Sequence, residues 1–185
     1  MLHIFLGLPY DHAGDFLLQL ELRGISRLHP HVPIRAKPIT PAILQTFHAL
    51  IDNSSLHSTV WSCCLILFYT MARVGSILPT SRSTPSKEFL TRDRINFCKE
   101  GLLVTLLRTK TIQFGKRRLH IPLLKVDSVL CPVAAFTQSL SFFGSSSYVP
   151  AFVFLEKGEM KWLTPSIFIR VFRDILARFP LALRP

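Results

Sequence analysis

Apolar residues recur at helical spacing after two Thr-Pro pairs. After Thr40-Pro41, and again after Thr164-Pro165, they fall three or four positions apart. Threonine is a favourable N-cap, and proline suits the first helical position because its missing N–H has no intrahelical partner there. The pattern predicts one helix over residues 41–51 and another over residues 165–178. Their inward residues are Ile43, Leu44, Phe47, Leu50, Ile51, Ile167, Phe168, Val171, Phe172, Ile175 and Leu176.

Two more helices are predicted between these. Residues 57–71 are apolar nearly all round, which is typical of a helix at the centre of a core. Cys131-Pro132 begins another helix, which extends to about Phe143 with Pro132 in the first position. We expect the first of these two helices to be the central helix of the fold.

The first 37 residues do not read as a complete domain. Apolar residues 1–8 form a turn or two of helix that stops at Pro9, and residues 16–22 predict a short helix that Gly24 ends. Several prolines interrupt residues 29–37, which indicates an extended linker. We therefore expect a helical remnant at residues 1–28, a linker at 29–37 and a domain at 38–185.

Three short strands are predicted at residues 94–98, 102–107 and 117–123. A turn over residues 99–101 joins the first two, and a loop over residues 109–116 joins the second to the third. Apolar residues occupy both faces of the middle strand, so it should be well covered. Residues 151–155 and 160–163 predict a small hairpin. The expected fold class is α+β, mainly helical with a three-stranded antiparallel sheet.

The charge of the chain is concentrated around this sheet. The 185 residues contain 22 Lys and Arg against 11 Asp and Glu, a net charge of +11. Nine of these cations and only two acids lie within residues 92–125. A solvated basic face is one interpretation, but few acids are present to form ion pairs, so phosphate contact is favoured. A hydrophobic content of 49% excludes a wholly disordered basic tail.

Metal, disulfide and membrane signals are weak. The four cysteines form no C-x-x-C pair, and no histidine pair lies near them at zinc-like spacing, so we expect reduced thiols and no metal or cofactor. The longest apolar stretch, residues 60–72, is shorter than the roughly 20 residues that a membrane-spanning helix needs. The opening residues have no cationic region of a signal peptide. We expect a soluble protein inside the cell.

Arg73 is the first charged residue after the apolar stretch 60–72, and Gly75 and Pro79 then break the helix. One interpretation is that the arginine complements the helix C-terminus while its stem extends outward. The other is a guanidinium that a rigid element holds over an anion. Position alone leaves both open.

The order of these features resembles the catalytic domain of tyrosine recombinases, the phage integrase family, in its eukaryotic, mobile-element-derived branch. The segments that carry the resemblance are KPITPAIL at 37–44, LFYTMARVGSILP at 67–79, LTRDRINF at 90–97, LLRTKTIQFGKRRLHIPL at 106–123 and LCPVAAF at 130–136. It covers roughly residues 30–180. It implies that residues 38–185 are the N-terminal half of the catalytic domain, and residues 1–28 the last piece of a core-binding, SAM-like domain.

The resemblance implies roles for particular residues. In this family a tyrosine attacks a DNA phosphate, arginines bind the phosphoryl oxygens, and a lysine on the β-hairpin loop protonates the leaving oxygen. Arg73 matches the first arginine and Lys110 the lysine, with Lys116 as the second choice for the lysine. Preorganised guanidinium donors suit the first role, and an ammonium that can release a proton suits the second. Backbone-phosphate contacts are expected from Arg108, Thr109, Lys116, Arg117 and Arg118, whereas Arg94 is expected to be an exposed strand residue.

The sequence departs from the family in three respects. The acidic residue that many members carry shortly after the first arginine is absent, and no H-x-x-R occurs anywhere in the chain. Tyr10 precedes the domain, Tyr69 falls in the buried helix and Tyr148 in a serine-rich turn, so none matches the nucleophile. We therefore expect a truncated domain that binds DNA without covalent catalysis. We also expect Phe168, Val171, Phe172 and the helix at 60–72 to be partly uncovered.

The leading hypothesis is a nuclear protein that binds double-stranded DNA, related to enzymes of DNA recombination and integration. It would form a homo-oligomer on DNA if a C-terminal half were supplied. An alternative is a basic interaction module that docks an acidic protein or an anionic membrane, although no basic amphipathic helix favours a membrane. A metal-dependent nuclease would need a carboxylate cluster, and Glu88, Asp93 and Glu100 are too scattered to form one.

Overall fold

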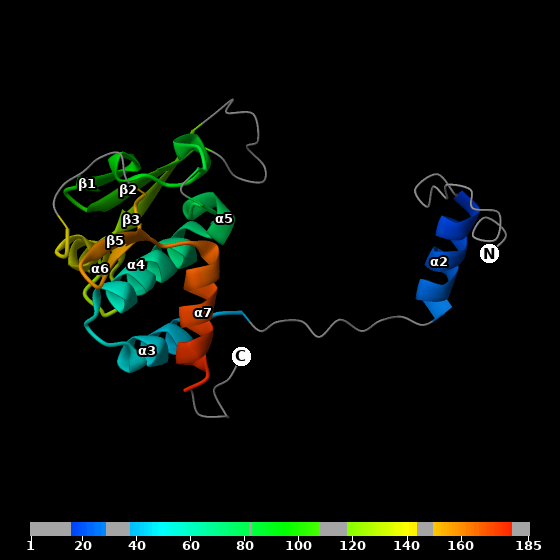
Figure 1. Ribbon diagram of the computed structural model, residues 1–185, viewed down its shortest axis with the longest axis horizontal. Helices are drawn as coiled ribbons and strands as arrows, with labels where there is room; N and C mark the ends of the chain where they lie inside the picture. The colour runs from blue at the N-terminus through cyan, green and yellow to red at the C-terminus, as the bar shows by residue number, and fades with distance from the viewer. Residues whose placement is uncertain (1–15, 29–37, 82, 108–117, 144–149, 179–185) are drawn as a thin grey trace. The chain divides into compact units, whose positions relative to one another are not determined.

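The computed structural model describes residues 16–28, 38–81, 83–107, 118–143 and 150–178, and the chain divides into two units, residues 1–37 and 38–185 (Figure 1). In the first unit, helix α2 spans Phe16–Leu28. The prediction that Gly24 ends this helix is wrong, because one glycine costs an exposed helix only about 1 kcal/mol and the leucine-rich flanks favour helix. The helix predicted over residues 1–8 and the linker at 29–37 lie outside the described residues.

The helices of the second unit begin where local capping predicts. Helix α3 spans Pro41–Leu50, α6 spans Pro132–Leu140 and α7 spans Pro165–Leu176, each with proline in its first turn. The Thr40 and Thr164 hydroxyls each accept a backbone N–H at 3.4 Å, and the Cys131 sulfur accepts one at 3.5 Å. All three predicted helix starts are confirmed.

The three-stranded antiparallel sheet is also confirmed. Strand β1 spans Ile95–Cys98, β2 spans Gly101–Leu106 and β3 spans Leu119–Leu124, in the order β1-β2-β3. Leu102, Val104 and Leu106 are all buried, as expected for the middle strand. Strands β4, Val153–Glu156, and β5, Glu159–Trp162, form the separate predicted hairpin. The protein is therefore of the α+β class.

Helix α4, Ser55–Thr70, is the central helix of the core. Every side chain from Ser58 to Ile66 is buried. The helix packs against α6, α7 and β4 (Figure 1). Two hydrogen bonds tie it to β4: the Thr59 hydroxyl donates to the Val153 carbonyl at 2.8 Å, and the Leu155 N–H donates to the Ser55 hydroxyl at 3.0 Å.

Helix α7 covers the core more completely than predicted. It contacts α3 and α4, and the Phe172 ring stacks on that of Phe47 with centroids 4.7 Å apart. Phe168 and Val171 are each only 7% exposed. The prediction that Phe168 and Val171 are partly uncovered is therefore wrong, because the apolar face of α7 packs on α3 and α4 of the same unit. For Phe172 and the last residues of the apolar stretch 60–72 the prediction is confirmed, because Phe172, Leu67, Phe68 and Ala72 are only partly buried.

Three short turns connect α4 to β1. They are the single-turn helix α5, Val74–Ile77, and the 3₁₀ turns η1, Ser86–Glu88, and η2, Arg92–Arg94. The Leu90 N–H donates to the Ile77 carbonyl at 3.1 Å, which ties the chain after η1 to the end of α5. These turns lie in the segment that carries the candidate site.

Candidate nucleic-acid interface

Arg73 follows a tight turn at the C-terminal end of α4. Met71 takes the left-handed conformation, with φ of 51°. The Thr70 hydroxyl donates to the Ile66 carbonyl at 2.6 Å and accepts the Ala72 N–H at 3.3 Å. Arg73 then stands in extended backbone as the residue before α5, and it is exposed. The turn therefore holds the Arg73 backbone while leaving its side chain accessible to a ligand.

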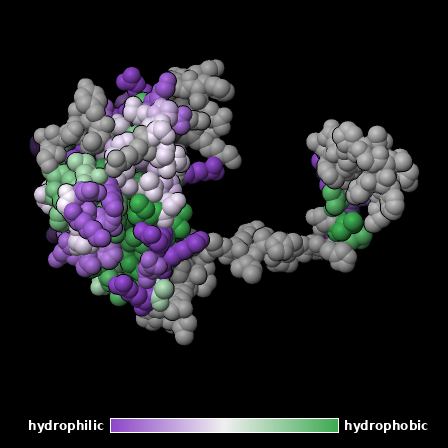
Figure 2. All heavy atoms as spheres, in the orientation of Figure 1, coloured by the Kyte–Doolittle hydropathy of each residue, from purple (hydrophilic) through white to green (hydrophobic). Residues whose placement is uncertain are grey.

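Helix α5 brings this turn to one end of the three-stranded sheet. The Ser76 N–H donates to the Arg73 carbonyl at 2.8 Å, and Ser76 lines a narrow gap together with Lys87 and Leu107. Leu107 directly follows β2 and precedes the segment 108–117. Figure 2 shows hydrophilic side chains projecting from the edge of the unit where Figure 1 draws α5. The Arg73 turn thus lies at the end of the sheet where the chain leaves β2.

Arg118 lies at the same end of the sheet. The residue after it, Leu119, pairs with Leu106 at the end of β2, and Arg118 itself is exposed. Among the described residues, the Arg73 guanidinium has no hydrogen-bond or ion-pair partner. The other predicted contacts, Arg108, Thr109, Lys110, Lys116 and Arg117, lie outside the described residues. Arg73 and Arg118, two of the residues that were predicted to contact DNA, therefore lie at the same end of the three-stranded sheet.

Two other arginines of the basic segment support the fold. The Arg94 guanidinium donates to the Ser86 carbonyl at 2.9 Å and to the Phe89 carbonyl at 3.0 Å. The prediction that Arg94 is an exposed strand residue is therefore wrong, since it is half-buried in η2. Arg92 is also half-buried, its guanidinium lies 5.3 Å from the centre of the Phe143 ring, and desolvation lowers its pKa. The number of charges in the sequence does not show that Arg92 and Arg94 support the fold while other cations of the segment are exposed.

Tyr69 is 37% exposed, so the prediction that it is buried is wrong. The continuous burial of α4 stops at Ile66, and the Tyr69 ring packs edge-on against that of Phe68, with centroids 5.4 Å apart. Tyr69 also stands four residues before Arg73. Its exclusion as a nucleophile therefore rests on the family resemblance rather than on inaccessibility. Tyr10 and Tyr148 lie outside the described residues.

The two cysteines of α4, Cys63 and Cys64, are unsuited to nucleophilic chemistry. All four cysteines are free thiols, and burial raises the pKa of Cys64 to about 12 and that of its neighbour Cys63 well above the ordinary value. Both thiols stay protonated near neutral pH and are poor nucleophiles. Across the described ranges, no three His, Cys, Asp or Glu side chains gather as metal ligands. The helices in those ranges are all too short or too polar to cross a bilayer.

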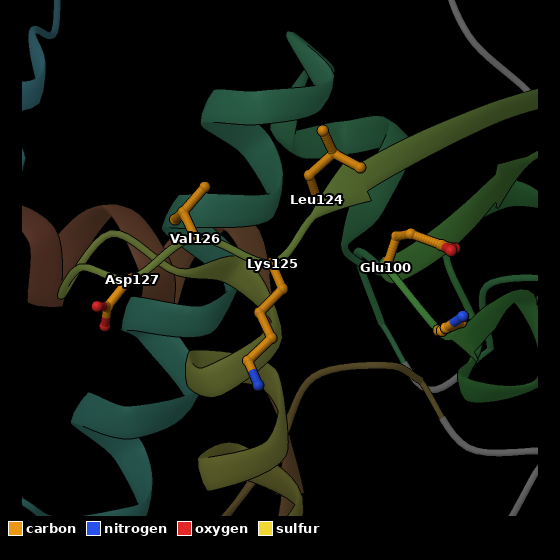
Figure 3. Close-up of a pocket in the computed structure, with 6 residues that line it drawn as sticks. Glu100, Leu124, Lys125, Val126 and Asp127 are labelled. Carbon is orange, nitrogen blue, oxygen red and sulfur yellow. The ribbon is translucent and has the colours of Figure 1, made fainter.

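A shallow hollow of about 690 Å³ lies at the opposite end of the sheet, beside the turn from β1 to β2 (Figure 3). Its lining residues are Lys99, Glu100, Leu124, Lys125, Val126 and Asp127. Figure 3 shows the carboxylates of Glu100 and Asp127 drawn on either side of Lys125. The charges of the two lysines and the two acids that line this hollow cancel.

Three residues of the Arg73 edge were not indicated by the sequence pattern: Thr70, Met71 and Lys87. A threonine in the last turn of a helix often bonds to the carbonyl four residues earlier, so a signal for Thr70 was present. The left-handed backbone at Met71 could not be predicted from the sequence, because glycine usually occupies that position. Lys87 reads as an ordinary lysine of a polar loop.

Comparison with known proteins does not assign the chain to a family: no family model matches the sequence, and no curated protein matches it.

Proposed function

We propose that this chain is a DNA-binding protein of the tyrosine-recombinase type, which contacts duplex DNA at the end of the sheet beside α5. The observation that carries the proposal is the position of the Arg73 turn, against the point where the chain leaves β2 for the segment that contains Lys110. An exposed guanidinium beside a basic loop suits a phosphate backbone, because planar donors match phosphate oxygens.

The proposed contacts divide into two groups. Arg73 and Lys110 bind one phosphate, with Lys116 as the alternative lysine. Arg118 and the loop residues Arg108, Thr109, Lys116 and Arg117 bind neighbouring phosphates and position the duplex without reading its sequence. We expect weak sequence preference for this reason.

Covalent chemistry is not part of the proposed activity. The chain contains no H-x-x-R, and none of its three tyrosines matches the family nucleophile. Arginine and lysine alone do not replace a nucleophile, because such groups act as a unit. Recombination or integration is thus attributed to the family and not to this chain alone.

The test is the affinity of the protein for a fluorescent duplex between about 50 and 200 mM salt. Six proposed cationic contacts predict a slope of log K against log salt of about −5, and a loss of roughly 10³-fold over this range. An affinity that stays flat across the range contradicts the proposal. It would instead favour the alternative, a basic module that docks an acidic protein.

A nicked duplex that traps phosphotyrosine is the companion experiment. No covalent adduct is expected with the wild-type protein. Tyr69→Phe serves as the matched variant, because Tyr69 is exposed and stands near Arg73. A covalent protein–DNA adduct that forms with the wild-type protein and not with Tyr69→Phe would show that Tyr69 is a nucleophile, which contradicts the proposal.

A further inference from the structure

A tight turn at η1 presents Lys87 at the same edge as Arg73. The Glu88 N–H donates to the Pro85 carbonyl at 2.9 Å, which closes the turn. The Arg94 guanidinium donates two more hydrogen bonds to this turn, one to the Ser86 carbonyl at 2.9 Å and one to the Phe89 carbonyl at 3.0 Å. Because both carbonyls are hydrogen-bonded to the Arg94 guanidinium, the turn is held in this conformation.

The turn is anchored to the core directly after η1. Phe89 is 4% exposed, and its ring centroid lies 6.0 Å from that of Trp162. Leu90, the next residue, donates its N–H to the Ile77 carbonyl of α5 at 3.1 Å. The position of Lys87 relative to α5 is therefore set by hydrogen bonds and a buried ring.

Lys87 itself is exposed and lines the gap that Ser76 and Leu107 also line. Among the described residues, no acid forms a salt bridge with its ammonium. The neighbouring Glu88 is half-buried and takes part in an interaction of its own. Lys87 lines the same gap as Ser76, which lies three residues after Arg73, and Glu88 is the one acid that lines this gap. An exposed ammonium that forms no salt bridge among the described residues is suited to contact phosphate oxygens.

We propose that Lys87 is a DNA phosphate contact that the basic loop does not supply, and that Arg94 is its positioning residue. This inference rests on the proposed function. Arg94 is assigned to positioning because its Nη1 atom donates to the Ser86 and Phe89 carbonyls, on either side of Lys87.

The test is the salt slope of duplex binding for Lys87→Gln, with Lys99→Gln as the matched control. Lys99 is also exposed but stands on the turn at the opposite end of the sheet. Lys87→Gln is expected to weaken binding about fivefold and to make the slope shallower by about 1, as the loss of one phosphate contact requires. Lys99→Gln is expected to leave both unchanged, and Lys87→Arg to preserve the wild-type slope.

Arg94→Lys tests the positioning role, because it keeps the positive charge but does not place a donor where Nη1 of Arg94 contacts both the Ser86 and the Phe89 carbonyl. It is expected to weaken binding and flatten the slope as Lys87→Gln does, and the double variant is expected to be no weaker than either single variant. A double variant whose losses add would show that Arg94 contacts DNA itself, which overturns the positioning role.

The outcomes separate this inference from the proposed function. A flat salt dependence of the wild-type protein overturns the proposed function and the role of Lys87 with it. A steep wild-type slope that Lys87→Gln leaves unchanged overturns the role of Lys87 alone.

Discussion

Met71 is the residue at which the candidate site stores backbone strain. Its φ of 51° lies in the left-handed region, which costs a non-glycine residue roughly 1–2 kcal/mol. Its side chain is 81% exposed, so burial of apolar surface offsets little of this cost. The strained residue stands two positions before Arg73, at the point that sets the direction in which the chain leaves α4.

Met71→Gly is expected to raise the free energy of unfolding by about 1 kcal/mol, because glycine adopts this conformation without steric cost. Urea denaturation measures the change. Met160→Gly is the matched control: Met160 is also exposed, but it lies in β5 opposite Leu155, so this variant is expected to be less stable than wild type. A Met71→Gly protein that is less stable than wild type would show that the Met71 side chain makes a stabilising contact.

Arginine is the residue type whose role the sequence predicted least reliably. Arg73, Arg92, Arg94 and Arg118 all read as cations in or near one basic segment. In the structure Arg73 and Arg118 are exposed, whereas Arg92 lies over a ring and Arg94 binds two carbonyls. The difference depends on residues distant in the sequence or on loop backbone, and neither leaves a periodic pattern.

Elements with local start signals were predicted well. The Thr-Pro pairs at 40–41 and 164–165 and the Cys-Pro pair at 131–132 carry both the cap and the first turn of their helices. The strands followed from apolar runs separated by turn residues. These signals act over four or five residues, so one sequence is enough to detect them.

Elements whose outcome depends on tertiary packing were predicted less well. The inner face of α7 was expected to be partly uncovered, but Phe168 and Val171 are each only 7% exposed. Which faces meet is decided by packing between α3, α4 and α7, and hydrophobic spacing within each helix does not identify the partner.

The joint between α4 and β4 offers a test at the scale of elements. Thr59→Val keeps the shape of the side chain and removes the hydrogen bond to the buried Val153 carbonyl. It is expected to lower the free energy of unfolding by about 1–2 kcal/mol, because a buried carbonyl loses its hydroxyl partner.

Thr46→Val in α3 is the control for this variant. The Thr46 hydroxyl donates to the Ala42 carbonyl of its own helix at 3.1 Å, and water can replace it there. A change under about 0.5 kcal/mol is expected. Equal losses in the two variants would mean that the α4–β4 bond contributes nothing specific.

At the scale of the whole molecule, the two ends of the three-stranded sheet differ in charge. One end has exposed Arg73, Lys87 and Arg118, and Glu88, which is half-buried, is the one acid that lines the gap there. The other end has Lys99 and Lys125 balanced by two acids. We therefore expect a polyanion to bind at the first end rather than at the second.

The central claim is that Arg73 and Lys110 meet at one phosphate, and a double-mutant cycle on duplex affinity tests it most directly. Arg73→Gln, Lys110→Gln and the double variant are measured at one salt concentration, with the pair Arg73→Gln and Lys99→Gln as control. Two cations on one phosphate predict a coupling energy of about 0.5–3 kcal/mol, with an additive control pair. Additivity of Arg73→Gln and Lys110→Gln within about 0.3–0.5 kcal/mol would contradict the claim.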